Sequence, residues 1–529
     1  MLFLKSLRPI VELSAYVSLL FLSTGLAQRR SVPQDHDATP SLVLRGTISA
    51  SQNNSYVEVP FTVPPGTERV TLAFSYTGKD QRTTLDLGML DSEQLRCWSG
   101  GNKSELTVRV ADATPSCLPG PISPGRWRVL IGVPNIRAGQ TSTYTANVYF
   151  TRNELVANQP AALRTPVRSE PAWYRGDLHM HTAHSDGSCT SLGGAKVPCP
   201  VFVTLEAAAH RGLDFIAVTD HNTTSHYAAM RELAPYFDTV LLIPGREITT
   251  FHGHFNLLGT EDFLDFRLGS KEVPDMNSLL RSASMLGGVI SINHPNAPTG
   301  EVCMGCGWTP NPPAELSLVQ AVEAVNAGAE EGPYSGLSFW ERQLNQGFRL
   351  TAVGGSDNHT PQRPLDQVGS VGSPTTVVHA TALSTPEILG AIRAGHVFVD
   401  LTATRDRLLE MRAKSGEQLA SMGDVLDAAP EADVTFQMHT EDVDGASLVL
   451  IEDSNPVTGL TGGKLSGPEQ STEFHWKSDG KRHWFRADVR GPDGKLWLLG
   501  NPIYINWPLP DHKLVSKQMP LRKGAGQGR

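Results

Sequence analysis

Five times between residues 174 and 360, a short apolar run typical of a buried strand ends in histidine, aspartate or glutamate. Examples are Phe215–Thr219, Gly288–Asn293 and Arg349–Gly354, and amphipathic stretches such as Val203–Arg211 and Met276–Leu286 separate the runs. Strand–helix alternation over about 225 residues predicts a parallel sheet or an α/β barrel. In such barrels the C-terminal strand ends form one face, so we expect the polar groups to meet there.

These polar groups are of the kinds that bind metal ions. In Asp177-Leu-His179-Met-His181, the two histidines lie two residues apart, so in an extended segment they point to the same face and can hold one ion together. Ten of the 17 histidines fall in this part of the chain, most of them just after an apolar run. A lone histidine is usually structural, but this repetition at strand ends predicts a metal centre. The candidate ligands are His179, His181, Asp186, His221, Glu247, His254, His294, Asp357 and His359.

Several neighbouring residues are weaker candidates. His252 lies two residues before His254, so either could be the ligand, and we favour His254. His184 could act as an acid or base near the metals, although a solvent-facing role is more common. Arg246 and Arg363 lie beside metal motifs and could bind an anionic substrate oxygen, with an ordinary salt bridge as the equal alternative.

The motifs together resemble the PHP (polymerase and histidinol phosphatase) superfamily. The resemblance rests on Asp-Leu-His-Met-His-Thr followed by Ser-Asp-Gly, on Thr-Asp-His-Asn, on Gly-Arg-Glu before Gly-His, on Asn-His-Pro and on Gly-Ser-Asp-Asn-His, in that order. It covers about residues 174–402. The sequence around Glu247 and His254 is most similar to the CehA/McbA branch, which includes carbaryl hydrolase.

The resemblance implies a distorted (βα)7 barrel with two or three divalent ions, namely zinc, manganese or iron. Carried over to this sequence, one ion would be held by His179, His181, Glu247 and Asp357. A second would share Glu247 with His254 and His294, and a third would take Asp186, His221 and His359. Members similar to histidinol phosphatase often have a histidine where this chain has Asp186, which leaves the filling of the third position open.

A di- or trinuclear centre favours hydrolysis, because bound cations lower the pKa of water and neutralise developing charge. Glu247, Asp357 and His359 are the expected catalytic residues, with Asp357 or His359 managing protons. We expect a phosphoesterase acting on a mono- or diester of a small molecule. The alternative is a carbamate, ester or amide hydrolase of the carbaryl-hydrolase type, and a less favoured one is a non-catalytic metal-bearing binding protein.

The regions on either side read as all-β. Residues 40–152 and 408–508 contain short alternating runs such as Arg69–Tyr76 and Asp433–His439 between glycine- and proline-rich turns, which predicts two sandwich-like domains. Residues 153–171 read as a linker, 172–407 as the catalytic domain and 509–529 as a disordered tail. The β domains could contact a surface or a polysaccharide.

The first 27 residues resemble a secretory signal peptide. Lys5 and Arg8 precede an apolar stretch, and small residues lead to a predicted cleavage after Ala27. The stretch has about 12 residues, whereas a spanning helix needs about 20, so we expect a secreted or periplasmic protein without a membrane segment after cleavage. Six cysteines fit an oxidising compartment and fall into three local pairs, although 15 connectivities are possible. The pairs are Cys97 with Cys117, Cys189 with Cys199, and Cys303 with Cys306, the last of which could instead be a redox motif or half a zinc knuckle.

The charge balance speaks against one class of partner. The formal net charge is −9, and no basic cluster stands out. Nucleic-acid binders neutralise phosphates with Lys and Arg, so we expect no nucleic-acid partner and no DNA-processing role.

Overall fold

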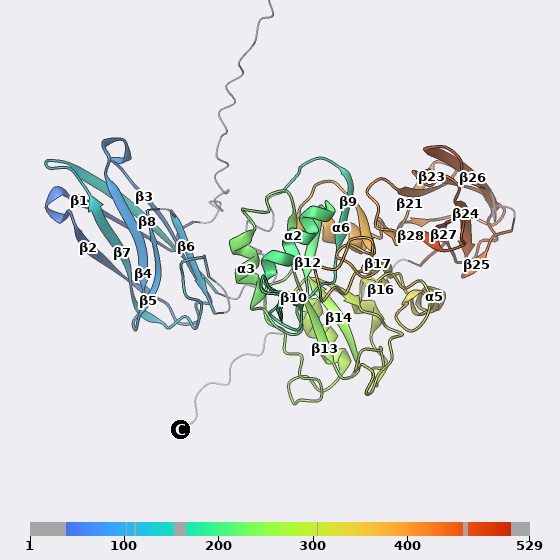
Figure 1. Ribbon diagram of the computed structural model, residues 1–529, viewed down its shortest axis with the longest axis horizontal. Helices are drawn as coiled ribbons and strands as arrows, with labels where there is room; N and C mark the ends of the chain where they lie inside the picture. Colours follow the sequence, from blue (N-terminus) through green and yellow to red (C-terminus); the bar gives the residue numbers. More distant parts are fainter. Residues whose placement is uncertain are drawn as a thin grey trace, which may run out of the picture.

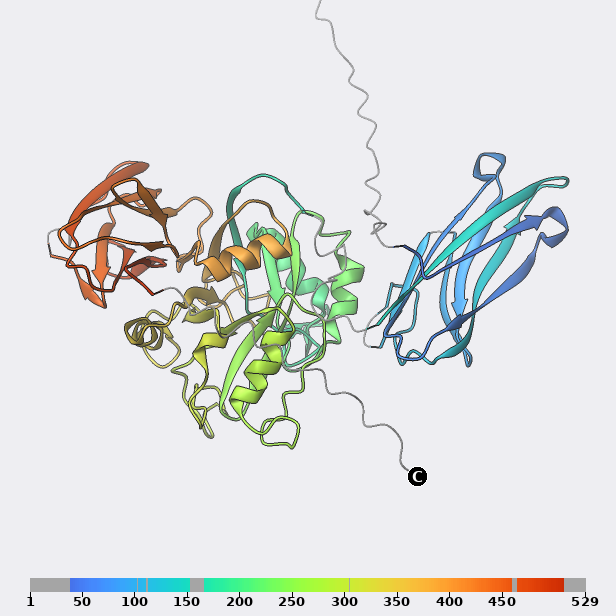
Figure 2. The same ribbon diagram turned by 180° about the vertical axis from the view of Figure 1, so that it is seen from behind.

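The computed structural model describes residues 39–101, 103–110, 113–152, 166–303, 305–458 and 464–508. It contains a β-rich N-terminal region, a central α/β region and a β-rich C-terminal region, arranged side by side with the central region in the middle (Figures 1 and 2). The predicted signal peptide 1–27, its cleavage site and the tail 509–529 lie outside the described residues, as does most of the predicted linker. No described helix has the length and apolarity to span a bilayer.

The N-terminal region consists of two four-stranded antiparallel sheets. One has the order β1-β8-β3-β6 and the other β2-β7-β4-β5. Alternating side chains of both sheets, including Trp127, Leu72 and Val148, are buried in one core, which is the burial pattern of a β-sandwich. The bounds are β1 Leu42–Ser49, β2 Ser55–Val63, β3 Arg69–Tyr76, β4 Thr84–Leu90, β5 Leu95–Gly100, β6 Glu105–Arg109, β7 Gly125–Asn135 and β8 Thr141–Thr151, with short 3-10 turns at Ala50–Gln52 and Lys79–Gln81.

The central region is built on a curled sheet with the strand order β17-β16-β15-β14-β13-β12-β9-β18-β19. The strands are β9 Ala172–Asp177, β12 Phe215–Val218, β13 Leu241–Thr250, β14 Gly253–Leu258, β15 Val289–Ile292, β16 Ala321–Asn326, β17 Thr351–Gly355, β18 Thr375–Ala380 and β19 Val397–Asp400. The two ends approach each other, since Met180 forms a parallel bridge with Asn358 and the Gly354 amide donates to Thr376 Oγ1 at 2.8 Å. A small separate hairpin is formed by β10 Ser188–Thr190 and β11 Lys196–Pro198.

Five α-helices occur among the described residues of 172–407, and they pack around this sheet (Figures 1 and 2). They are α2 Val201–Arg211, α3 His226–Leu233, α4 Met276–Met285, α5 Leu337–Gln346 and α6 Thr385–Ala394, together with a 3-10 turn at Leu316–Leu318. Ile388 and Ile392 of α6 share a core with Phe215 and Val289, which begin their strands. Helix α6 therefore closes the end of the curled sheet opposite the ends where the metal motifs lie.

The regular (βα)7 pattern that the resemblance implied is not confirmed. Strands β13 and β14 are joined by a tight turn at Phe251 and His252, and a connection this short can only join antiparallel strands. The segments after β15 and β17 are rich in proline and glycine, which removes helical hydrogen bonds and explains why no α-helix follows either strand directly. The coarser prediction of a mixed α/β region with β-rich flanks describes the chain.

The C-terminal strands continue the central sheet, because β19 pairs with β28. Asn501 reinforces this junction, since its side chain binds both the amide and the carbonyl of Ala352 in β17. The remaining C-terminal strands form a four-stranded sheet, β21-β20-β23-β26. Side chains of both sheets, among them Phe436 and Phe485, share one core, as in the sandwich-like packing expected for this region. The bounds are β20 Leu408–Ser415, β21 Gln418–Ser421, β22 Val425–Leu426, β23 Asp433–Glu441, β24 Ser447–Glu452, β25 Asn455–Pro456, β26 Glu469–Lys477, β27 His483–Arg490, β28 Leu496–Gly500 and β29 Ile503–Ile505.

Two of the three expected cysteine pairs are disulfides in the structure. These are Cys97–Cys117 in the sandwich and Cys303–Cys306 in the segment after β15. Cys189 and Cys199 are buried thiols.

Candidate metal centre

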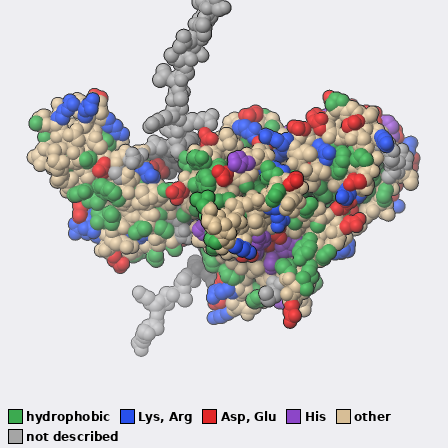
Figure 3. Space-filling view, in the orientation of Figure 1, with side chains coloured by type: hydrophobic (Ala, Val, Ile, Leu, Met, Phe, Trp, Pro, Cys, Tyr) green, Lys and Arg blue, Asp and Glu red, His purple; other side chains and the backbone are tan. Residues whose placement is uncertain are grey.

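The nine candidate ligands lie at one end of the curled central sheet. The parallel strands β9, β12, β15 and β17 deliver the residues that follow them, and the hairpin β13–β14 adds two more from within its strands. Figure 3 shows histidine side chains gathered in a recess of the central region, next to apolar side chains. The set comprises His179, His181 and Asp186 after β9, His221 after β12, Glu247 in β13, His254 in β14, His294 after β15, and Asp357 and His359 after β17.

Glu247 lies at the middle of the cluster and is 1% exposed. Its Oε2 is 3.3 Å from His179 Nε2 and 3.0 Å from His221 Nδ1. Its Oε1 is 3.2 Å from both His254 Nδ1 and His294 Nε2. The two carboxylate oxygens thus face different sets of imidazoles, which is the arrangement needed for one carboxylate to bridge two cations.

A second carboxylate, Asp357, faces the pair at the end of β9. Its Oδ1 is 3.4 Å from His179 Nε2 and 3.2 Å from His181 Nε2. These three residues form one of the groups whose donor atoms all lie within 4.8 Å of one another, and His179, Glu247 and His294 form another. The first two expected ligand sets therefore adjoin through His179 and Glu247.

The third group lies closer to solvent. Asp186 is 3.2 Å from His359 Nε2 and 3.6 Å from His221 Nε2, and its side chain is 57% exposed. His181 also belongs to this group, because its Nδ1 is 3.9 Å from Asp186 and its ring stacks on that of His359 at 4.1 Å. The resemblance implied the first position for His181, whereas in the structure it lies between the first and third groups.

The donor chemistry of the cluster fits divalent cations. Among the described residues, His179 Nε2 and His181 Nε2 are buried and make no hydrogen bond of good geometry, although carboxylate oxygens lie 3.2 to 3.4 Å away. Unpaired buried nitrogens are costly, and cation binding to an imidazole lone pair would remove the cost for those that face the cluster. The mixture of neutral nitrogen and carboxylate oxygen suits zinc, manganese or iron.

Electrostatics divide the residues into charged and neutral donors. Burial alone would raise the pKa of Glu247, but His179 and His221 lower it well below its usual range. Burial would lower the pKa of His221, and Glu247 and Asp186 together raise it to about 10. For His181 burial prevails and lowers the pKa to about 4, so its imidazole is neutral at pH 7 and ready to coordinate.

Buried polar side chains behind the ligands hold them in position. Asp177 accepts from the amides of His179 and Ser356 at 3.2 and 3.0 Å and so joins β9 to the segment after β17. Asn293 donates to Glu247 Oε1 at 3.0 Å.

Glu323, in β16, is the functional residue that sequence reasoning missed. Its Oε1 is 2.9 Å from His179 Nδ1, and its Oε2 accepts from the backbone amide of His294 at 3.0 Å. It is 2% exposed. The available signal was a charged residue inside the otherwise apolar run Ala321–Val325, since a carboxylate is rarely buried without partners.

Three weaker candidates lie outside the ligand cluster. Arg246 is buried on the opposite face of β13 from Glu247, because neighbours in a strand alternate, and it donates to the carbonyl of Asp262. Its guanidinium therefore points away from the cluster, and its contact with substrate stays a prediction. Arg363 is exposed and donates to the Val368 carbonyl at 3.0 Å. His184 is half-buried, and its Nδ1 contacts Ser225 Oγ at 2.7 Å.

Of the two histidines in the β13–β14 hairpin, His254 faces Glu247, whereas His252 is exposed in the turn. The backbone carbonyl of His252 accepts from Thr309 at 2.9 Å, which ties the turn to the segment that follows His294.

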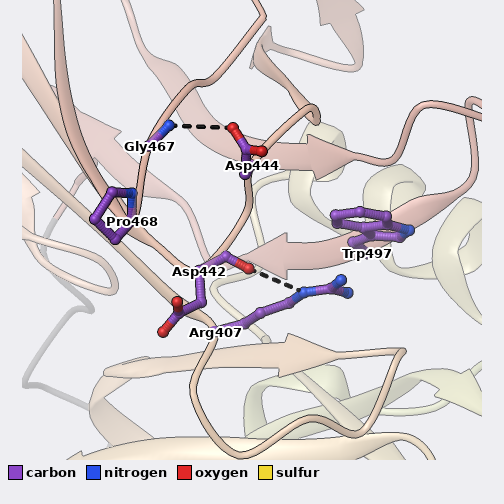
Figure 4. Close-up of a pocket in the computed structure, with 6 residues that line it drawn as sticks. All are labelled: Arg407, Asp442, Asp444, Gly467, Pro468 and Trp497. Atoms are coloured by element: carbon purple, nitrogen blue, oxygen red, sulfur yellow. Dashed lines mark hydrogen bonds between the residues drawn. The ribbon is translucent and has the colours of Figure 1, made fainter.

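The C-terminal region has a separate open hollow of about 560 Å³ (Figure 4). It is lined by Arg407, Asp442, Asp444, Gly467, Pro468 and Trp497. The Arg407 guanidinium lies 3.6 Å from the centre of the Trp497 ring, and its Nε donates to the Asp442 carbonyl. With one cation and two exposed carboxylates, this hollow does not share the donor set of the central cluster.

The protein has only weak similarity to the known proteins with which it was compared. No protein-family model matches the sequence, and no curated protein matches it. A solved structure from Bacteroides vulgatus, described as a two-domain protein containing a predicted PHP-like metal-dependent phosphoesterase, is 20% identical with a TM-score of 0.37, over 67% of this chain and 98% of that one. A mitogen from Yersinia pseudotuberculosis is 12% identical with a TM-score of 0.15, over 22% of this chain and 93% of that one. Both TM-scores are low, so the interpretation of the centre depends on its own geometry.

Proposed function

We propose that this chain is a metal-dependent hydrolase whose centre holds two or three divalent cations. The observation that carries the proposal is the position of Glu247, whose two oxygens face separate imidazole sets. Bound cations would supply Lewis acidity, lowering the pKa of water and stabilising negative charge on the attacked group. His179, His181, Glu247 and Asp357 would hold the first, Glu247, His254 and His294 the second, and Asp186, His221 and His359 the third.

The residues of the chain would position the reactants and move protons. His359 is the most accessible ring of the cluster at 36% side-chain exposure, and its Nδ1 is 2.9 Å from the backbone carbonyl of Asp357. This contact fixes the ring with Nε2 toward Asp186 and solvent. In a centre that holds two cations, with the third position empty, Nε2 of His359 would be free to give a proton to a leaving group. Asp357, which is better shielded, would keep a carboxylate beside the reacting atoms.

Phosphoesters are the substrates we favour first, because adjacent cations offset the charge of a phosphoryl group better than that of a neutral carbonyl. The PHP-like resemblance of the five motifs points the same way. A small phosphate mono- or diester is the proposed substrate, and the distorted PHP-type barrel is the proposed description of the central fold.

A specific observation supports carbamates, esters or amides as the second candidate. Across the described ranges, the ion pairs of Asp186, Glu247 and Asp357 involve histidine alone, and a phosphate site usually adds Arg or Lys. The loops that follow the ligand-bearing strands also expose apolar side chains, among them Phe251 at 79% and Val302 at 77%. An apolar rim suits an organic ester with little charge.

A direct assay separates the two candidates. The protein would be reconstituted with Zn²⁺, Mn²⁺ or Fe²⁺ and given bis-p-nitrophenyl phosphate, p-nitrophenyl phosphate and a 1-naphthyl carbamate, with metal content counted in parallel. Phosphate turnover that disappears in His179→Ala supports the phosphoesterase, and carbamate turnover alone supports the second candidate. A fully metallated protein inert toward all three would favour a binding role.

Export remains part of the proposal. A secreted or periplasmic location depends on residues 1–27, which lie outside the described residues. The predicted polysaccharide contact of the β-rich regions likewise remains a proposal.

A further inference from the structure

The hairpin β10–β11 is separate from the main sheets. It forms a two-stranded sheet with three residue pairs and joins no other sheet. Within it, Cys189 is the buried side chain, and Cys199, which directly follows β11, is also buried. Isolated two-stranded hairpins are marginally stable in water, so this one depends on its contacts with the rest of the chain. These contacts include the two buried cysteines and the hydrogen bonds between Thr190 and Gln362.

Cys199 and Ser188 make backbone hydrogen bonds to the segments that carry the third ligand group. The Cys199 carbonyl accepts from Ala183 at 2.7 Å, and its amide donates to the Gly187 carbonyl at 2.9 Å. Both ends of the turn that carries Asp186 are therefore bonded to Cys199. The Ser188 amide donates to the carbonyl of His359 at 2.7 Å, which joins the same hairpin to the second ligand of this group.

The two thiols lie on the same face of the hairpin. The antiparallel register places Cys189 opposite Val197, and Cys199 follows Val197 by two residues. Burial, and after it the neighbouring Cys189 thiol, raise the pKa of the Cys199 thiol. The other four cysteines already form disulfides. The Asp186 side chain is 57% exposed, so the backbone contacts of its turn, among them those to Cys199, set its position.

We propose that Cys189 and Cys199 form a disulfide, and that this disulfide fixes the Asp186 turn for the third cation. The inference rests on the metal centre proposed above. In the reaction, the two thiols lose two protons and two electrons to an external disulfide such as oxidised glutathione, which is reduced to two thiols while one S–S bond forms. Since both sulfurs are buried, the bond forms during folding, before the hairpin closes over them.

The first test maps the cysteines of the full chain, expressed and folded with reduced and oxidised glutathione present. Free thiols are alkylated under denaturing conditions, and the peptides are identified by mass. We expect a linked peptide containing Cys189 and Cys199. Free Cys189 and Cys199 in protein whose other two pairs are linked would overturn the disulfide.

The second test counts metal in the wild type and in Cys189→Ser/Cys199→Ser, with Cys97→Ser/Cys117→Ser as the control for losing a disulfide remote from the centre. We expect the third equivalent of Zn²⁺ to bind about 10-fold or more weakly in the first variant only, as when a supporting residue of a ligand is lost. Amide exchange at residues 183–190 should also become faster in that variant. Unchanged affinity and exchange would overturn the link to the third cation, and so would a wild type that binds one or two equivalents. A wild type that binds no metal would instead remove the proposed function, while the cysteine mapping still decides whether the disulfide exists.

Discussion

Oε1 of Glu323 lies 2.9 Å from Nδ1 of His179 and holds that side of the ring. Nε2 of His179 is left facing Glu247 and Asp357. The second carboxylate oxygen of Glu323 holds the backbone of His294. One buried side chain thereby sets the orientation of ligands from two of the proposed cation positions. The tight fit is visible at Gly355, where a Cβ would lie 2.2 Å from Glu323 Oε1.

Glu323→Gln should weaken metal binding without removing a ligand. A glutamine keeps the shape but loses the charge that favours the Nδ1–H form of His179, so we expect the affinity of the first position to fall about 10- to 100-fold. Competition with a chromophoric chelator measures this. Glu417→Gln, at an exposed position, is the matched control, and equal affinities in both variants would show that Glu323 has no positioning role.

Glu247→Ala tests the bridging geometry. Because its two oxygens face separate imidazole sets, removal should cost more than one equivalent of metal and nearly all hydrolytic activity. Metal content by mass spectrometry, set against thermal unfolding to verify the fold, gives the answer. A loss of one equivalent or none would contradict the bridge.

The two histidines of the β13–β14 hairpin should behave differently. His254→Ala removes a ring 3.2 Å from Glu247, so the second position should lose metal and activity should fall at least about 100-fold. His252→Ala changes an exposed side chain whose structural contacts are made by its backbone, and activity should stay within about twofold. Comparable losses in both variants would mean that the turn rearranges.

Much of the central region was readable from the sequence because its strands are buried on both faces. Phe215–Val218 and Val289–Ile292 are wholly buried, and a ligand follows each shortly after its end. We expected the nine candidate ligands to lie close together because most of them follow the ends of strands. Strand alternation also indicates that Arg246 points away from the cluster, since its neighbour Glu247 points into it.

Other features depend on contacts that a local pattern does not contain. The pairing of β19 with β28 joins residues about a hundred positions apart, and no short pattern predicts such a partner. The role of Glu323 is clear only once β16 lies beside His179 and His294.

The metal-free protein should lose stability as pH rises, whereas the stabilisation gained from metal should grow. The folded pKa of His221 is about 10, above its usual 6.5, because Glu247 and Asp186 outweigh the effect of burial. Its contribution is complete below pH 6.5 and disappears as pH rises through 10, at no more than about 1.4 kcal/mol per pH unit. His181, with a pKa lowered to about 4, is neutral throughout this range and does not offset the trend. Metal binding needs the neutral imidazole, so its own stabilisation rises over the same range. With excess chelator, the unfolding temperature should fall more between pH 7 and 9.5 for the wild type than for His221→Asn. With Zn²⁺ added, it should fall less for the wild type than for the variant. Parallel curves with chelator would show that His221 is not held charged by its two carboxylates.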